Sequence, residues 1–386
     1  MQFICGLQNL GNTCYMNSIV QVILHNPILN KFLIEKKFEN DLINNISSQS
    51  PTKIDNHLLI EKIKGTITFQ LYNLLMNMKD CNIISPDSFK NLLSNKNETF
   101  KGFRQNDSHE LLSFLLDTIH EETKSIVKPI YSKLPKEYHQ LQDIKKHFSE
   151  RIHSTSVKTE QLQYVDDYYN YEMAHQDEVL IHNAVSHWAK YLEKNYSVIS
   201  EFFAGMFHSS LKCDTCGYLS SSFEIFTILS LDIPSNIDNP TIIDCFDLFC
   251  TQDRLDENNK FICDRCGNST CGIKKLMLWY APEILIIHFK RFKQNGRNCS
   301  KNTKTISYQE TLDISKYVSR KSAGTEYKLI SVVHHYGGLD GGHYVSFNNV
   351  DDYWIQFNDS SIAKIVGDIH KQIINENSYI LIYKRR

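Results

Sequence analysis

The spacing of hydrophobic residues divides the chain into a helical first half and a strand-rich second half. Apolar side chains recur every three or four positions over residues 14–24, 58–78 and 105–122, which predicts amphipathic helices there. After Ser200 the apolar residues come in short runs rich in β-branched and aromatic side chains, which is typical of strands. These runs span residues 206–212, 223–233, 275–279, 284–289, 327–335, 344–347, 354–357 and 379–383. A helical half followed by a strand-rich half predicts an α+β fold.

Residues 123–185 interrupt this pattern with charged residues and tyrosines. Apolar residues at helical spacing between Tyr138 and Ile152 predict one further helix within the segment. We interpret the segment as an insertion and expect it to form a solvent-exposed elaboration of the surface, because long segments of this composition usually lie on the surface.

Composition narrows the class of protein. The chain has 386 residues, of which 41% are hydrophobic and 22% charged, as in a globular protein. Its net charge of -2 provides no positive field for nucleic acid or an anionic membrane, and no apolar run approaches the length of a membrane-spanning helix. The 11 cysteines are an odd number and no secretory leader pattern is evident. We therefore expect a reducing compartment, cytoplasmic and/or nuclear, and neither a nucleic-acid nor a membrane partner.

Cys14 is the first candidate for chemistry. It lies where the predicted helix begins, with Asn12 and Thr13 placed to cap the helix start. A cysteine at a helix N-terminus is stabilised as the reactive thiolate. The preceding Asn9 carries a side-chain amide that can face the oxyanion of a tetrahedral intermediate. The alternative is a buried, unreactive cysteine that packs as a small hydrophobic residue.

His343 follows a loop with two Gly-Gly pairs and precedes a predicted strand. An imidazole there can accept the proton of a thiol and later donate it to a leaving amine. Two predicted strands, 344–348 and 353–357, form a hairpin that returns the chain toward His343. Asn358 or Asp359, at the end of this hairpin, can then orient the imidazole. An ordinary histidine and an ordinary Asn-Asp turn are the alternatives.

Two Cys-x-x-Cys-Gly knuckles predict a metal site. Two thiolates three residues apart bind one metal, and two such pairs complete a tetrahedral site with no open position, so the expected role is structural zinc. Unpaired core cysteines or a redox pair are the alternatives. The predicted ligands are Cys213, Cys216, Cys263 and Cys266.

These motifs together resemble the ubiquitin-specific protease family. Residues 6–18 resemble its cysteine box, and residues 341–344 and 354–359 resemble its histidine box. The two knuckles are similar to the family's zinc fingers, residues 275–292 to its central palm strand, and residues 103–112 to the Gln-x-Asp-x-x-Glu segment of its thumb helix. The resemblance extends over residues 6–383.

This resemblance implies a papain-like cysteine protease with a helical thumb, a β-sheet palm and zinc-bearing fingers. The whole chain, 1–386, is then a single catalytic domain that grips ubiquitin, with the ubiquitin tail between thumb and palm. The thumb is expected over about 1–200 with the insertion at about 123–185, the fingers over about 203–280 and the palm over about 281–386.

The resemblance also implies a role for individual residues. Cys14 is the nucleophile, His343 the base and Asn358 the third member of the triad. The neighbouring Asp359 leaves open which of the two residues orients His343. The implied oxyanion-hole and substrate-binding residues are Asn9, Gln105, Asp107, Gly342 and Tyr344.

The resulting hypothesis is a deubiquitinating thiol protease that acts as a monomer on ubiquitin and ubiquitinated proteins. A ubiquitin-binding pseudoenzyme is one alternative, and it would be indicated by a missing catalytic residue. A protease for another ubiquitin-like modifier is a second, to be decided by turnover of several modifiers side by side. A zinc-ribbon nucleic-acid binder is a third, which the neutral charge disfavours.

Overall fold

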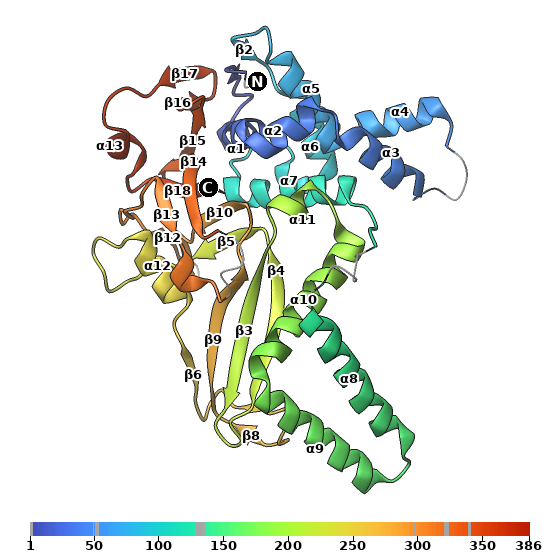
Figure 1. Cartoon of the computed structure of the whole chain (residues 1–386). Helices are drawn as coiled ribbons and strands as arrows, with labels where there is room; N and C mark the ends of the chain where they lie inside the picture. Colours follow the sequence, from blue (N-terminus) through green and yellow to red (C-terminus); the bar gives the residue numbers. More distant parts are fainter. Residues whose placement is uncertain are drawn as a thin grey trace.

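The structure is a computed structural model that describes residues 3–48, 50, 54–128, 134, 136–295, 298–319, 324–338 and 341–386. Figure 1 shows a cluster of helices beside a large sheet, with long strands extending downward from their junction and a helical arm alongside these strands. We name these parts the thumb, the palm, the fingers and the arm. The predicted α+β class is confirmed.

The thumb is a cluster of short helices around α1. Every residue of α1 is buried, because the helix packs against α7 on one side and the palm strand β15 on the other. The thumb elements are α1 (Cys14–His25), α2 (Pro27–Ile34), α3 (Phe38–Ser48), α4 (Asn56–Lys64), α5 (Ile67–Asn77), α6 (Asp87–Lys96), the 3-10 helix η1 (Glu98–Phe100), α7 (Ser108–Thr123), α11 (Val198–Phe202), and the paired strands β1 (Gly6–Leu7) and β2 (Ile83–Ile84).

The helix predicted over residues 58–78 is wrong as a single element, because the chain forms α4 and α5 instead. α4 ends at Gly65, whose N–H binds the carbonyl of Glu61, and the Thr66 hydroxyl accepts the N–H of Phe69 to cap α5. Gly65 ends one helix and Thr66 caps the next, so the helical backbone is interrupted there. The three- to four-residue spacing of apolar side chains nevertheless continues across the interruption. The helix predicted over 14–24 is confirmed as α1.

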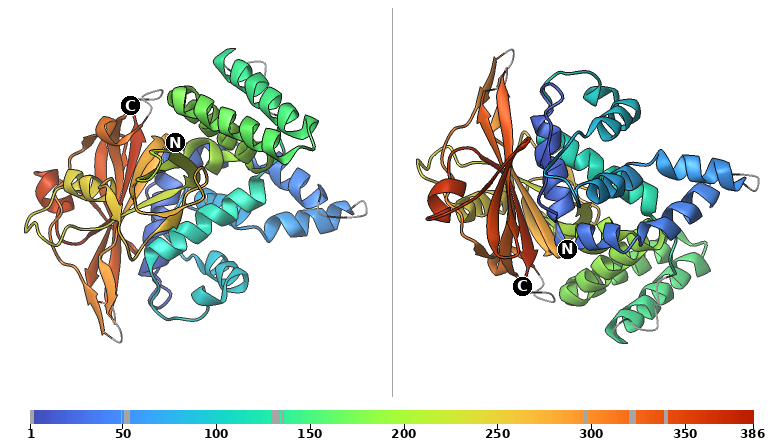
Figure 2. Two further views of the ribbon diagram at one scale, coloured as in Figure 1. Left: turned by 90° about the horizontal axis from the view of Figure 1, so that it is seen from below. Right: turned by 90° about the horizontal axis from the view of Figure 1, so that it is seen from above.

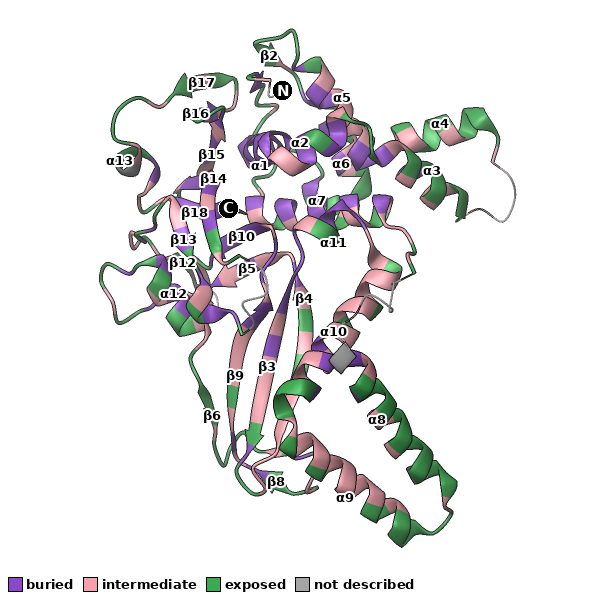
Figure 3. Cartoon of the chain, viewed as in Figure 1, coloured by how far each residue is buried: buried purple, intermediate pink, exposed green. Residues whose placement is uncertain are grey.

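The arm consists of α8 (Lys136–Ser154), α9 (Lys158–Ala174) and α10 (Gln176–Asn195). The helix predicted between Tyr138 and Ile152 is confirmed within α8. The tyrosine-rich residues after it form α9, which the hydrophobic pattern did not indicate. α10 packs through the buried Ala184 and the partly buried Trp188 onto the fingers, so the arm also contributes to the core. Figure 3 shows the outer surface of α8 as mainly exposed.

The fingers are a four-stranded antiparallel sheet with the order β4-β3-β9-β6. A short ribbon at the tip adds β7 paired with β8. The predicted run 223–233 is two strands, because the chain bends at Thr227 and leaves the fingers for the palm. The finger strands are β3 (Gly205–Cys213), β4 (Leu219–Phe226), β6 (Asp253–Leu255), β7 (Phe261–Ile262), β8 (Ser269–Thr270) and β9 (Gly272–Tyr280).

The palm is an eight-stranded sheet with the order β17-β16-β15-β14-β18-β10-β5, and β13 pairs with β14 beside this path. The pairing of β10 with β5 is parallel, and the other strand pairs are antiparallel. A separate hairpin of β11 and β12 follows β10. The palm elements are β5 (Ile228–Leu231), α12 (Ile242–Phe249), β10 (Ile284–Phe289), β11 (Phe292–Asn295), β12 (Asn298–Lys301), β13 (Thr311–Asp313), the 3-10 helix η3 (Ser315–Tyr317), β14 (Glu326–Gly337), β15 (Gly342–Val350), β16 (Tyr353–Asn358), β17 (Ser361–Lys364), α13 (Ile369–Ile373) and β18 (Ser378–Arg385).

Both faces of the palm sheet are covered. Along β10, Ile284 and Ile286 pack with the thumb, whereas Leu285 and Ile287 pack with α12 and its neighbours. This alternation follows from the two-residue period of a strand. Figure 2 shows the thumb and the arm on one side of the sheet and α12 and α13 on the other. The thumb face of β15 is therefore held directly against α1. No described helix is long and apolar enough to span a membrane.

Candidate functional site

Cys14 is the first residue of α1, as the sequence predicted, and it is 4% exposed. The free backbone N–H groups and the positive dipole end of the helix surround this position, and both favour the thiolate. The following residues Met16, Ile19 and Val20 are fully buried and anchor the helix in the core. The thiol is therefore fixed at the boundary between thumb and palm.

The start of α1 is not capped as predicted. Thr13 occupies the N-cap position without a side-chain cap bond, and its hydroxyl instead lies 3.3 Å from the side-chain oxygen of Asn9. The Asn12 side-chain amide donates to the carbonyl of Phe103 at 2.9 Å. These side chains stabilise the loop before the helix rather than the helix itself. Gly11, at φ 105°, provides the left-handed backbone that this loop requires.

His343, the second residue of β15, faces Cys14. The Nε2 atom of its ring donates to the Oδ1 atom of Asn358 at 2.6 Å, because an amide oxygen can only accept. The hydrogen-bond contact with Cys14 raises the pKa of His343 to about 9, partial burial opposes this rise, and the bond to Asn358 adds to it. The geometry therefore favours an imidazolium beside the thiol, held in one orientation by Asn358.

Asp359 makes different contacts from its neighbour. Its Oδ2 atom accepts from the side-chain amide of Asn9 at 2.8 Å, and its Oδ1 atom accepts from that of Asn17 at 2.8 Å. An asparagine amide has two donor hydrogens, so the bond to Asp359 leaves the second hydrogen of Asn9 for another acceptor. The structure thus separates the two residues that the sequence could not distinguish, since Asn358 contacts His343 and Asp359 contacts Asn9.

This division predicts a pattern of coupling between substitutions. Asp359→Ala and Asn9→Ala are each expected to lower kcat by about 10²-fold. The first substitution loosens the predicted oxyanion donor, the Asn9 amide, and the second removes it. Asn358→Ala is expected to lower kcat by a similar factor of about 10² through the imidazole. The double variant of Asn9 and Asp359 should lose little more than either single variant, whereas Asn9 with Asn358 should be close to additive.

Steady-state rates on a fluorogenic ubiquitin amide measure these couplings. Additive losses for Asn9 with Asp359 would contradict the assignment of Asp359 to the oxyanion donor.

Three of the four predicted substrate-binding residues lie where thumb and palm meet. The Oε1 atom of Gln105 accepts the backbone N–H of Gly342 at 2.8 Å, which joins the segment before α7 to the start of β15. Asp107 caps α7, and its Oδ2 atom accepts the hydroxyl of Tyr379 at 2.6 Å. The fourth, Tyr344, has a buried ring packed near Tyr379. The resemblance implied a substrate-binding role for all four, and that assignment stays a prediction.

Sequence reasoning missed two side chains at this junction. Asn17 holds Asp359, and Tyr379 holds Asp107. Asn17 gives only a weak signal, because it is one of four polar residues, with Ser18, Gln21 and His25, in a helix rich in apolar side chains. Tyr379 gives no such signal, because its strand pattern is that of an ordinary buried tyrosine.

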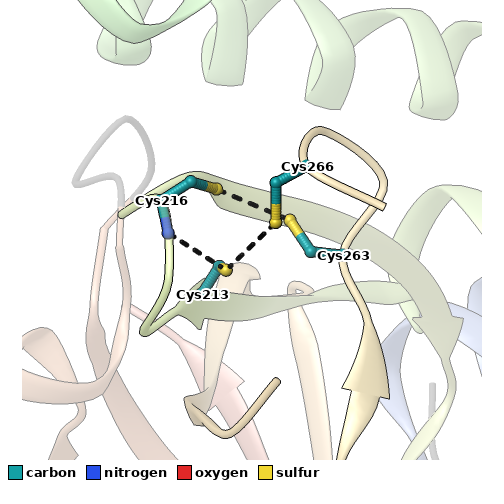
Figure 4. A group of neighbouring side chains, drawn as sticks. All are labelled: Cys213, Cys216, Cys263 and Cys266. Atoms are coloured by element: carbon teal, nitrogen blue, oxygen red, sulfur yellow. Dashed lines mark hydrogen bonds between the residues drawn. The ribbon is translucent and has the colours of Figure 1, made fainter. Parts of the chain in front are cut away.

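The four predicted metal ligands form one cluster. Figure 4 shows that Cys213, Cys216, Cys263 and Cys266 point toward a common centre, and their sulfur atoms all lie within 4.8 Å of one another. The sulfur atoms of Cys213 and Cys266 are 4.0 Å apart, and those of Cys216 and Cys263 are 3.7 Å apart. A tetrahedral zinc ion with bonds of about 2.3 Å would separate its sulfur ligands by about 3.8 Å. The donor set therefore fits zinc.

The two knuckles share one backbone geometry. Gly217 and Gly267 have φ angles of 70° and 67°, which glycine adopts without strain. Each glycine N–H binds the carbonyl of the first cysteine of its pair, at 3.0 Å and 2.9 Å respectively. Both knuckles thus close in the same tight turn. Cys271 lies outside the cluster, with its thiol 3.4 Å from a carboxylate oxygen of Glu257.

The arm contacts both knuckles. The Tyr169 hydroxyl donates to the carbonyl of Asp264 at 3.3 Å, and Arg265 donates to the Asn170 side chain at 2.8 Å. Beside the first knuckle, the Tyr218 hydroxyl donates to Glu172 at 3.1 Å. α9 thus contacts the turn between Cys263 and Cys266. It also contacts Tyr218, the residue that follows the first knuckle.

Comparison with known proteins places this site in a family. Residues 5–383 match the family model described as ubiquitin carboxyl-terminal hydrolase, and the chain belongs to this family of cysteine-type deubiquitinases. It is 29% identical to a probable ubiquitin carboxyl-terminal hydrolase of Acanthamoeba polyphaga mimivirus, over 99% of this chain and 90% of that protein. It is 30% identical to human ubiquitin carboxyl-terminal hydrolase 2, over 99% of this chain and 55% of that protein. The chain thus spans about half the length of the human relative.

Solved structures show the same fold. A chain of the SAGA DUB module of Ubp8, Sgf11, Sus1 and Sgf73, bound to monoubiquitin, aligns with a TM-score of 0.65 and 23% identity, over 99% of this chain and 69% of that chain. A chain of the yeast SAGA DUB module aligns with a TM-score of 0.64 and 22% identity, over 99% of this chain and 68% of that chain. The predicted papain-like fold with thumb, palm and fingers is thereby confirmed.

Proposed function

We propose that the chain hydrolyses isopeptide and peptide bonds after the C-terminal glycine of ubiquitin. The observation that carries the proposal is the contact of the Cys14 thiol with His343, whose other ring nitrogen is held by Asn358. A nucleophile, a base and an orienting group are thus assembled in a member of a deubiquitinase family. The presence of all three argues against a pseudoenzyme that only binds ubiquitin.

The proposed reaction is acyl transfer in two steps. The Cys14 thiolate attacks the carbonyl carbon of the terminal glycine, and the oxyanion that forms is stabilised by the Asn9 amide and the backbone N–H of Cys14. The His343 imidazolium donates its proton to the nitrogen of the departing amine, and the C–N bond breaks to leave a thioester. His343 then accepts a proton from water, whose oxygen attacks the thioester and releases ubiquitin and the thiolate.

Selectivity for a Gly-Gly tail is proposed to arise where the thumb meets the palm. The bond from Gly342 to Gln105 brings the backbone of β15 to a side chain of the thumb. Gly338 and Gly341, on the two sides of the turn before His343, carry no side chain. We propose that a slim tail passes this narrow point and that bulkier C-termini do not.

Ubiquitin and ubiquitinated proteins are the proposed partners. The SAGA DUB module relative is a multi-subunit assembly bound to monoubiquitin. In this chain, all the proposed catalytic groups come from one polypeptide, which supports action as a monomer. A structural zinc ion in the fingers is proposed from the four clustered thiols. Cytoplasm or nucleus is the proposed location, and the ten cysteines whose side chains the structure describes, which are free, are compatible with it.

A ubiquitin that carries a C-terminal electrophile tests the proposal. It is expected to form a covalent adduct with the wild-type chain and none with Cys14→Ala. Cys81→Ala is the matched control, because Cys81 is an exposed thiol outside the site and its loss should leave labelling unchanged. A folded wild-type protein that stays unlabelled would refute the proposed activity.

A further inference from the structure

Among the described residues, no strand pairs with the end of β14 on one of its two sides. β14 pairs with β15 along one edge and with β18 along the other, but the pairing with β18 ends at His334 opposite Ser378. One further bond joins the N–H of His335 to the carbonyl of Asn377 at 2.8 Å. Residues two apart in a strand direct their polar groups to the same side, so the carbonyls of His335 and Gly337 both face this edge beyond the end of β18.

Lys301 occupies this edge. Its Nζ atom, at the end of β12, donates to the carbonyl of His335 at 2.6 Å and to the carbonyl of Gly337 at 2.8 Å. Partial burial, together with the nearby Arg291, lowers the pKa of Lys301. One side chain thus provides both hydrogen-bond donors that a neighbouring strand would have supplied.

The backbone that Lys301 holds lies directly opposite His343. In the register of the sheet, Tyr336 pairs with His343, and the two carbonyls bound by Lys301 flank Tyr336. Gly342, the first residue of β15, is packed tightly against the end of β14. A Cβ atom at this position would overlap the ring of His335. A displacement of the end of β14 would therefore displace His343 relative to Cys14.

We propose that Lys301 is a positioning residue for His343, which acts by replacing the missing strand at the end of β14. This inference rests on the proposed thiol-protease function. Lys301 works through the backbone, so its loss should impair the alignment of the imidazole with the thiol rather than the binding of ubiquitin. A purely structural role would instead lower stability and leave this alignment unchanged.

Lys304 offers a matched control three residues away. Its Nζ atom also binds backbone carbonyls, those of Ser235 at 2.8 Å and Ile237 at 2.6 Å, but these belong to the loop before α12. Lys301→Met and Lys304→Met therefore remove the same kind of interaction, one next to His343 and one elsewhere in the palm. Lys301→Arg keeps a cation with several donors at the tested position.

The first measurement needs no ubiquitin. The rate of Cys14 alkylation by iodoacetamide is followed against pH by mass spectrometry of the Cys14 peptide in the full-length protein. An aligned imidazolium favours the reactive thiolate, so Lys301→Met should lower the rate of alkylation at neutral pH by about tenfold, whereas Lys304→Met should leave it unchanged. Lys301→Arg should restore most of the wild-type profile.

The second measurement is turnover of a fluorogenic ubiquitin amide. Lys301→Met is expected to lower kcat about tenfold and to change KM less than about twofold, while Lys304→Met keeps the wild-type kcat. Unchanged alkylation and kcat in folded Lys301→Met would overturn the proposal, as would equal losses in Lys304→Met. If Lys301→Met does not fold, Lys301→Gln, which retains one donor group, gives the same comparison. A wild-type protein that alkylates normally but does not turn over ubiquitin would refute the proposed function and leave the alkylation test of Lys301 valid.

Discussion

His343→Ala is expected to lower kcat on a ubiquitin amide by about 10³-fold to 10⁴-fold, with the fold retained. The substitution removes both the partner that favours the Cys14 thiolate and the proton donor for the leaving amine. Its effect exceeds that of Asn358→Ala, because Asn358 only orients the ring. His153→Ala, on the exposed surface of α8, is a suitable control. A loss below about tenfold in His343→Ala would exclude His343 as the general acid and base.

The raised pKa of His343 predicts how this activity depends on pH. The contact with Cys14 raises this pKa to about 9, so the imidazolium is present below that pH and loses its proton as the pH rises through it. The rate of amide cleavage should therefore decline on the alkaline side with a midpoint near pH 9. Asn358→Ala should move this midpoint downward, since the bond to Asn358 also raises the pKa. A midpoint near the ordinary histidine value of about 6.5 would indicate that the ion pair does not form.

Cys263→Ser is expected to have the second-largest effect, on stability rather than on chemistry. Zinc bound by four thiolates contributes about 10 kcal/mol or more to the folding of small zinc domains, and the loss of one ligand forfeits much of it. Besides zinc, the fingertip depends on its contacts with α9, because β7 and β8 contain only 2 residues each. We expect lost zinc by metal analysis, rapid hydrogen exchange in residues 261–270 and a higher KM for a ubiquitin amide.

Cys271→Ser is the matched control for this substitution, because Cys271 lies near the cluster but outside it. It should retain zinc and the wild-type exchange rates. Active wild-type protein without zinc would contradict the metal assignment, and equal damage from both substitutions would show that the effect is not specific to the ligands.

The sequence predicted an element well where its run of apolar residues is strong and where polar residues or a proline mark both of its ends. β10 was predicted residue for residue, since a run that is apolar except for His288 follows Pro282-Glu283 and stops before Lys290. α9 was not predicted, because its tyrosines make contacts through their hydroxyls that a hydrophobic pattern does not register. Tyr168, for example, donates to Glu172 one turn later at 2.6 Å.

In the candidate site, too, the sequence predicted the motifs but not the contacts between individual side chains. Cys14, His343 and Asn358 were predicted because each stands in a recognisable motif. The choice between Asn358 and Asp359 depended on strand geometry, since successive side chains point to opposite faces and Asp359, at φ 50°, already lies beyond β16. Lys301 could not be predicted, because its partners are backbone carbonyls, which carry no sequence signature.

The contacts of α9 with both knuckles close the polypeptide into a ring. The arm leads from α7 to α9, which contacts the fingertip, and α10 then leads back to α11 in the thumb, from which the fingers begin. The fingertip is thus attached at two places, through the strands of the fingers and through α9. These contacts restrain the fingertip at a second point besides the strands of the fingers, so deletion of α8 and α9 is expected to leave the fingertip less restrained relative to the thumb.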